Sequence, residues 1–91
     1  MSAKAVPVLA SELHMMDSAH TGRTYRISIS LPLGYNKSPD EGWPFHNTPE
    51  KWPVVYLLDA NWYSGMVTDT VRYMSRCGVT TDAIIVGIGY D

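Results

Sequence analysis

The residues best placed for chemistry follow an apolar run in the middle of the chain. Residues 54–58 are continuously apolar, and Asp59, Ala60, Asn61 and Trp62 come directly after them. In open α/β sheets, ligands lie outside the carboxyl ends of the strands, so this order predicts a site at the end of the run. A carboxylate at such a position suggests side-chain chemistry, which makes Asp59 the first residue to consider.

Asp59 has two interpretations. Some phosphatases use an aspartate as nucleophile in an Asp-x-Asp run at a strand end, but here the second acidic position is Asn61. The alternative is that Asp59 accepts hydrogen bonds from backbone N–H groups and so anchors the loop that follows. We favour the anchoring role, because two antiparallel strands are expected before this one.

Two other groups contain reactive residue types in an unsuitable arrangement. Asp17, Ser18 and His20 lie within one expected turn, where neighbours cannot face one another as a catalytic relay requires. Gly87 and Gly89 form only part of a dinucleotide-binding turn, whose third glycine would fall beyond Asp91, so we expect them to permit a tight bend.

The histidines and the cysteine do not indicate a metal site. His14 and His46 have no partner at metal-ligand spacing and are expected at the surface or in a loop. Cys77 is the only cysteine and is expected to be a small buried residue near a helix end. No metal and no cofactor is therefore expected.

Two alternating segments predict a pair of strands before the site. Polarity alternates over residues 9–16 and 25–31, which is typical of half-buried strands. Residues 17–22 carry turn chemistry, so the two strands are expected to form an antiparallel hairpin. A loop is expected over residues 36–51, held to the body by Trp43, Phe45 and Trp52. One face of the first strand is expected to carry Leu9, Leu13 and Met15. One face of the second is expected to carry Tyr25, Ile27, Ile29 and Leu31, and its other face Arg26, Ser28 and Ser30.

A strand, a helix and a second strand are expected after the loop. Residues 54–58 and 83–89 are apolar throughout, which is typical of parallel strands covered on both faces. Between them, a helical pattern starts at residues 64–66 and is expected to stop at Gly78. This order predicts a right-handed crossover. The expected inner stripe is Met66, Val67, Thr70, Val71 and Met74, with Asp69, Arg72 and Arg76 facing away.

Composition excludes several classes of function. The chain has 91 residues, of which 45% are apolar and 18% charged, and this balance argues against disorder. A net charge of −2 provides no basic patch for nucleic acid. The sequence has no basic amphipathic segment that would bind a membrane surface and no apolar run of about 18 residues that would span one. The first residues do not form a secretory signal. We therefore expect a cytoplasmic protein.

The expected elements make an incomplete sheet. One parallel strand pair with a single helix leaves a sheet face bare and strand edges unpaired, which is unfavourable. We therefore expect residues 1–91 to be the N-terminal fragment of one larger α/β domain.

Four segments in order resemble an esterase family of the α/β-hydrolase fold. They are residues 18–27, residues 31–35, residues 52–61 and residues 83–90, whose sequences are SAHTGRTYRI, LPLGY, WPVVYLLDAN and AIIVGIGY. The family includes siderophore esterases and esterase D-like enzymes. The resemblance implies an antiparallel hairpin followed by a mostly parallel sheet, of which this chain would be the N-terminal portion.

The resemblance also implies a serine hydrolase whose catalytic groups lie elsewhere. The family uses a Ser, Asp/Glu, His triad with its serine in a G-x-S-x-G elbow, and this sequence contains no such elbow. It implies an oxyanion-hole backbone N–H at Asn61, in a loop supported by Asp59 and Ala60. Trp62 is expected to line the pocket. The family pattern has glycine where this chain has Ala60, which would cause strain if that position needs a positive φ.

Two functions follow as hypotheses. The first is the N-terminal part of a serine carboxylesterase or siderophore esterase, acting on a small-molecule ester and inactive alone. The second is a non-catalytic α/β fragment that interacts through its open sheet edge. The substrate and the oligomeric state cannot be derived from the sequence.

Overall fold

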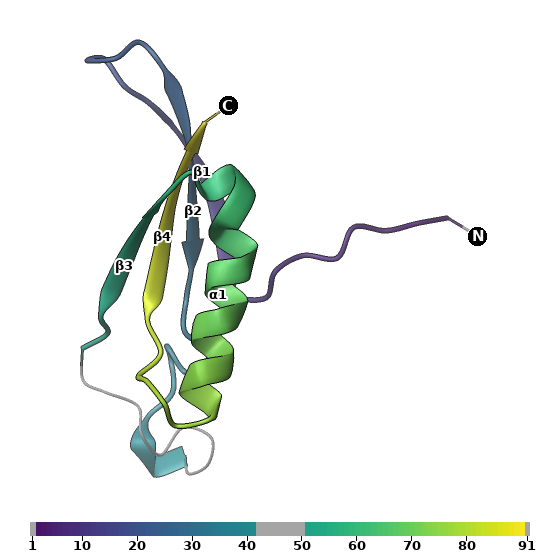
Figure 1. Ribbon diagram of the computed structural model, residues 1–91, viewed down its shortest axis with the longest axis vertical. Coiled ribbons are helices and arrows are strands. Elements are labelled where there is room, and N and C mark those ends of the chain that lie inside the picture. Colours follow the sequence, from purple (N-terminus) through teal and green to yellow (C-terminus); the bar gives the residue numbers. More distant parts are fainter. Residues whose placement is uncertain (1, 42–50, 91) are drawn as a thin grey trace.

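The computed structural model describes residues 2–41 and 51–90 (Figure 1). Within these residues the chain forms four strands, one α-helix and a short 3-10 helix, in the order β1, β2, η1, β3, α1 and β4. Their bounds are Ser11–Asp17 for β1, Thr24–Ser30 for β2, Pro39–Glu41 for η1, Val54–Leu58 for β3, Ala60–Arg76 for α1 and Ile84–Tyr90 for β4. Trp43, Phe45 and His46 lie outside the described residues. Trp52 packs beside Tyr35, with their ring centroids 6.4 Å apart.

The strands form one mixed sheet in the order β1-β2-β4-β3. The predicted hairpin is confirmed, since β1 and β2 pair antiparallel. The predicted parallel pair is also confirmed, since β3 and β4 run in the same direction with α1 between them in the sequence. The sequence did not predict the third pairing, in which β2 and β4 run antiparallel from Tyr25 opposite Tyr90 to Ser30 opposite Ile85.

Helix α1 lies on one face of the sheet and begins earlier than predicted (Figure 1). It starts at Ala60, directly after Asp59, so the expected polar loop before Ser64 is wrong. Serine, asparagine and glycine in this stretch made a loop plausible. In the folded chain, however, Ser64 faces the sheet and bonds to Ser28 there. Small residues are needed at this position because the helix and the sheet approach closely.

The stripe that faces the sheet also differs from the prediction. Met66 is 62% exposed and Met74 is 36% exposed, so the expectation that both are core is wrong. The buried positions of α1 are Ala60 and Thr68. Arg72 does not face away, because its guanidinium donates a 2.9 Å hydrogen bond to the carbonyl of Leu31. The contact face is therefore rotated toward small and hydroxyl-bearing residues.

The end of α1 matches the predicted stop. Gly78 has φ +78°, which a residue without a Cβ adopts readily. Its N–H donates to Ser75 O at 3.0 Å, and the N–H of Val79 donates to Met74 O at 2.9 Å. This pair of bonds is a Schellman motif, which satisfies the last carbonyls of the helix. Cys77 caps the helix but is exposed, so the expectation that it is buried is wrong.

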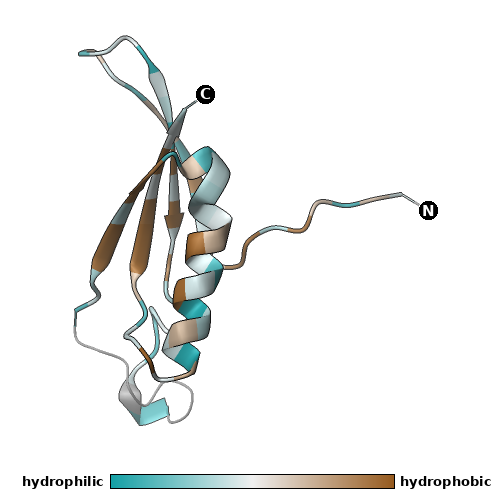
Figure 2. Ribbon diagram, in the orientation of Figure 1, coloured by the Kyte–Doolittle hydropathy of each residue, from teal (hydrophilic) through white to brown (hydrophobic). Residues whose placement is uncertain are grey.

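The apolar strands are less covered than the sequence predicted. β3 lies at an edge of the sheet, where Tyr56 is 71% exposed and Leu58 is 68% exposed, so this strand is not covered on both faces. β1 lies at the other edge and is exposed along its whole length, including Leu13 and Met15. Figure 2 shows apolar colour along β3 and β4, with α1 on one side of them only. No helix of residues 2–41 and 51–90 has the length and apolar character to cross a membrane.

Candidate functional site

The candidate site lies where β3 and β4 end. The two strands are parallel, with Leu58 opposite Ile88, so their carboxyl ends meet at the same edge of the sheet. Asp59 and the first turn of α1 follow β3 at this edge, beside the last residues of β4. The chain therefore brings residues 59–61 next to Gly89 and Tyr90, which lie about thirty positions later in the sequence.

Asp59 makes the turn from strand to helix through its backbone. It has φ 56° and ψ 39°, which is the left-handed region. Aspartate tolerates this conformation better than most residues other than glycine. Its side chain makes no capping hydrogen bond to α1, so the expected anchoring of the helix N–H groups by its carboxylate is not observed. The strain that the sequence suggested for Ala60 falls on Asp59 instead, because Ala60 has no positive φ.

Ala60 supports the turn by packing against the sheet. It is 6% exposed and lies over β4 at Gly87. A Cβ built on Gly87 would stand 2.7 Å from the Ala60 Cβ and 2.5 Å from Ser28 Oγ. The helix can therefore rest directly on the strand backbone only because position 87 has no side chain.

Asn61 connects the helix to the end of β4. Its Nδ2 donates a 2.7 Å hydrogen bond to Tyr90 O, and its Oδ1 accepts a 3.2 Å hydrogen bond from the N–H of Tyr90. The backbone N–H of Asn61 belongs to the first turn of α1, where N–H groups have no carbonyl four residues earlier within the helix. N–H groups in the first turn of a helix, at the positive end of its dipole, favour negatively charged ligands.

Trp62 projects into solvent beside this turn. Its side chain is 83% exposed, while its N–H donates a 3.1 Å hydrogen bond to Asp59 O. Trp62 is not among the residues that line the groove between α1 and the strands β1 and β2. Its expected role in a pocket stays a prediction.

A cluster that the sequence did not predict lies at the same edge. The rings of Tyr25 and Tyr90 are 5.9 Å apart, and the Arg23 guanidinium lies 5.9 Å from the centroid of the Tyr90 ring. The pairing of β2 with β4 creates this cluster, since it places Tyr25 opposite Tyr90. No local sequence pattern could have predicted it, because the two strands are far apart in the chain.

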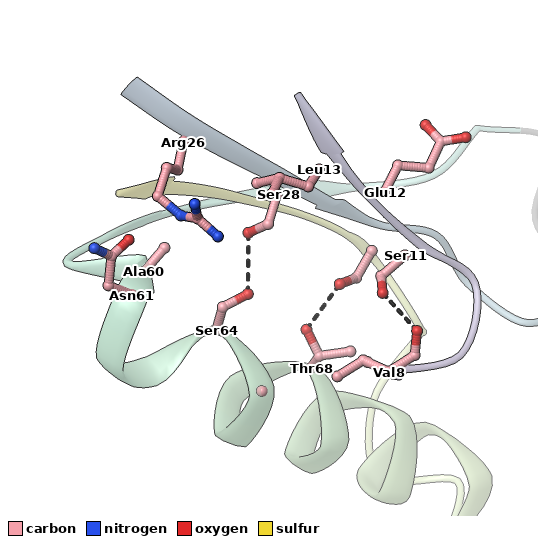
Figure 3. Close-up of a pocket in the computed structure, with 12 residues that line it drawn as sticks. Val8, Ser11, Glu12, Leu13, Arg26, Ser28, Ala60, Asn61, Ser64 and Thr68 are labelled. Atoms are coloured by element: carbon pink, nitrogen blue, oxygen red, sulfur yellow. Dashed lines mark hydrogen bonds between the residues drawn. The ribbon is translucent and has the colours of Figure 1, made fainter. Parts of the chain in front are cut away.

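A polar groove of about 330 Å³ lies between α1 and the strands β1 and β2 (Figure 3). Its hydroxyl groups pair with one another, Ser28 with Ser64 at 3.1 Å and Thr68 with Ser30 at 3.1 Å. Figure 3 shows the Arg26 side chain reaching into the groove near Ser28 and Asn61. No histidine lines the groove, so none of these serines has a base that could activate it as a nucleophile.

The other candidates do not assemble into a site. His14 is exposed and lies 3.2 Å from Glu12, which agrees with its expected surface position. Asp17 accepts a 2.6 Å hydrogen bond from Thr24 across the hairpin and does not act with Ser18 and His20 as a relay. In residues 2–41 and 51–90, no group of three His, Cys, Asp or Glu residues could hold a metal ion.

Comparison with known proteins identifies esterases as relatives of this chain. No protein-family model matches the chain. The chain is 38% identical over 93 aligned positions to the ferri-bacillibactin esterase BesA of Bacillus subtilis (strain 168). The alignment covers 99% of this chain and 28% of that protein.

Two solved structures have a similar fold over part of their length. The crystal structure of a BES protein from Bacillus cereus matches with a TM-score of 0.73 and 28% identity, over 99% of this chain and 31% of the other. A ferulic acid esterase matches with a TM-score of 0.58 and 21% identity, over 86% of this chain and 30% of the other, which shows the fold alone.

These matches confirm the predicted resemblance to esterases. The chain spans 28% of the length of the curated relative it matches, and a similar share of the two structures. In residues 2–41 and 51–90 it has a small mixed sheet and one α-helix, and this arrangement matches part of these esterase structures. The chain is a homologue of part of an esterase-type hydrolase and is similar to the ferri-bacillibactin esterase.

Proposed function

We propose that residues 1–91 form the N-terminal part of a single α/β-hydrolase domain and contribute an oxyanion-hole N–H from the turn between β3 and α1. The observation that carries this proposal is the position of the Asn61 N–H. It lies in the first turn of a helix that starts directly after a parallel strand, at the edge of the sheet where ligands bind. Similarity to the ferri-bacillibactin esterase over nearly the whole chain supports the assignment.

The proposed role is electrostatic. Attack on an ester carbonyl places negative charge on its oxygen, and a fixed N–H aimed at that oxygen lowers the barrier by about 3 kcal/mol. The N–H of Asn61 would be one such donor, strengthened by the positive end of the α1 dipole. Asp59 and Ala60 support it, the first by its left-handed backbone and the second by packing on Gly87.

The remaining catalytic groups are proposed to lie after Asp91. The sequence has no G-x-S-x-G elbow, and Ser64 is bonded to Ser28 rather than to a histidine. Without a nucleophile, no tetrahedral oxyanion forms for the N–H of Asn61 to stabilise. We therefore propose that the 91 residues have no esterase activity by themselves.

The proposed substrate is a small-molecule ester. The relative with the highest identity given above is named as an esterase of ferri-bacillibactin, which makes an iron-siderophore ester one reasonable substrate to test. No cofactor or nucleic acid is part of the proposal. A cytoplasmic location stays a prediction.

One observation favours a second candidate, a non-catalytic fragment that binds a partner through its sheet edge. β3 is an edge strand with an exposed apolar surface formed by Val54, Val55, Tyr56 and Leu58. Unpaired edges of this kind readily accept another strand. In the esterase proposal, the rest of the domain would cover the same edge.

The test is to read the coding sequence past Asp91 and to express the protein encoded by that complete reading frame. We expect a G-x-S-x-G motif within about one hundred further residues and hydrolysis of a chromogenic short-chain ester. The separate 91-residue chain should show no hydrolysis above background. A stop codon directly after Asp91 would refute the esterase proposal and favour the second candidate. Turnover by the separate chain would refute the proposed absence of the nucleophile.

A further inference from the structure

We propose that the Asn61 side chain is a positioning residue that clamps the first turn of α1 to the end of β4 and so aims its own backbone N–H. This inference rests on the proposed function of that N–H as an oxyanion donor. It adds a separate role for the carboxamide of Asn61, because the family pattern specifies no residue type at this position.

The clamp has the geometry of a strand pairing. The carboxamide donates to the carbonyl of Tyr90 at 2.7 Å and accepts from the N–H of Tyr90 at 3.2 Å. Both backbone groups of Tyr90 are thus bonded by one side chain, much as a neighbouring strand would bond them. Because two bonds fix the carboxamide, the Cα of Asn61 and the adjacent N–H have little freedom to rotate.

The packing between Asn61 and β4 leaves no room for a side chain at position 89. A Cβ on Gly89 would overlap Oδ1 of Asn61 and would stand 3.2 Å from the Asn61 backbone nitrogen. Gly89 is buried and has no positive φ, so its small size is required by the approach of Asn61 and not by the backbone conformation. Two residues earlier in β4, Gly87 leaves space for Ala60 in the same way.

The clamp compensates for a weak start of the helix. Asp59 provides no capping hydrogen bond, and its backbone is in the left-handed region. A helix start without a capping side chain frays more readily, and fraying would misdirect the N–H groups of the first turn. The bonds to Tyr90 hold this turn from the side.

The experiment compares Asn61→Ala, Gly89→Ala and the double variant in the complete reading frame. Removing a whole oxyanion donor lowers kcat by about 100- to 1000-fold, so a misaimed donor should lower it by about 10- to 100-fold. KM should change less than about twofold, since an interaction made in the transition state is lost. The exposed Asn36 provides a matched control, and Asn36→Ala should keep the parent kcat and KM.

The double variant separates the clamp from general damage. In Asn61→Ala the carboxamide is gone, so the added methyl of Gly89→Ala no longer overlaps Oδ1 and keeps only its 3.2 Å approach to the backbone nitrogen of residue 61. We expect the double variant to lose about as much kcat as either single variant, and not the product of the two losses. Multiplied losses would mean that the two residues act independently, which would overturn the inference.

Amide hydrogen exchange provides a readout that does not depend on activity. The N–H of Tyr90 should exchange at least about tenfold faster in Asn61→Ala than in the parent, because its acceptor is removed. Unchanged protection of Tyr90, or unchanged kcat in an active parent background, would overturn the inference. An inactive parent with the predicted loss of protection would refute the proposed esterase function while leaving the clamp in place.

Discussion

The two faces of the sheet are built from different residues. On the face that α1 covers, β2 and β4 present Ser28, Ser30, Gly87 and Gly89, with Ile85 as the one large apolar residue. Because side chains alternate along a strand, the opposite face carries the neighbouring residues. Those residues are large and apolar, namely Tyr25, Ile27, Ile29, Val86 and Ile88, and no helix of the described chain covers them.

The size of the side chains on each face determines how closely another layer can approach the sheet. Glycine and serine let α1 rest on the strand backbone, which brings Asn61 within bonding distance of Tyr90. Isoleucine and valine on the other face would hold a covering layer further away. The face beneath α1 therefore sets the position of the candidate site, whereas the opposite face supplies apolar area that the rest of a larger domain is expected to bury.

The largest change in the free energy of unfolding is expected from a substitution on the uncovered face. Ile88→Ala in the complete reading frame should lower the free energy of unfolding by about 2–4 kcal/mol if further elements bury this side chain. In the separate 91-residue chain Ile88 is only half-buried, so the same change should cost about 1 kcal/mol or less. Urea denaturation of both lengths measures the difference.

A matched position on the covered face provides the control. Ile85 is 2% exposed beneath α1 within the chain itself. Ile85→Ala should therefore cost about 2–4 kcal/mol in both lengths. Equal costs of Ile88→Ala in the two lengths would show that nothing further covers the opposite face.

The next largest change in stability is expected where α1 approaches β4 closely, at Gly87. In Gly87→Ala, the new methyl group would meet Ser28 Oγ and the Ala60 Cβ, so we expect a loss of about 1–3 kcal/mol from overpacking. Gly65→Ala is the control, because a Cβ there meets nothing within 4 Å and lies inside the helix. That change should stabilise the protein by about 0.5–1 kcal/mol. Thermal unfolding of the two variants should move in opposite directions, and a tolerated Gly87→Ala would contradict the close packing.

Local patterns were sufficient to predict most elements of the fold. The alternation in β2, the continuous apolar run of β3 and the glycine at position 78 each reflect a constraint within a few residues. The start of α1 and its inner face were predicted wrongly, because Met66 and Met74 are apolar but the sheet accepts only small residues at that distance. Hydrophobic periodicity does not record how closely two elements approach.

The candidate site shows the same limit. Residues 59–62 were found from a strand end and from the family resemblance, and residues 59–61 lie beside the end of β4 in the structure. The bonds between Asn61 and Tyr90 depend on where α1 lies along β4, so no local sequence pattern predicts them. The left-handed backbone of Asp59 was not predicted either, because the family resemblance places the possible strain at Ala60, the position of the family's glycine.

The smallest expected effect concerns the hydroxyl pairs under α1. Thr68 is 1% exposed and donates a 3.1 Å hydrogen bond to Ser30 Oγ, which is 3% exposed. Thr68→Val keeps the branched shape but leaves the Ser30 hydroxyl without this partner, so the free energy of unfolding should fall by about 1–2 kcal/mol. Adding Ser30→Ala removes the unpaired group and should recover part of that loss, whereas additive losses would mean that the bond contributes little. Because both hydroxyls lie on the covered face, the recovery would show that α1 is held there by polar pairing as well as by close packing.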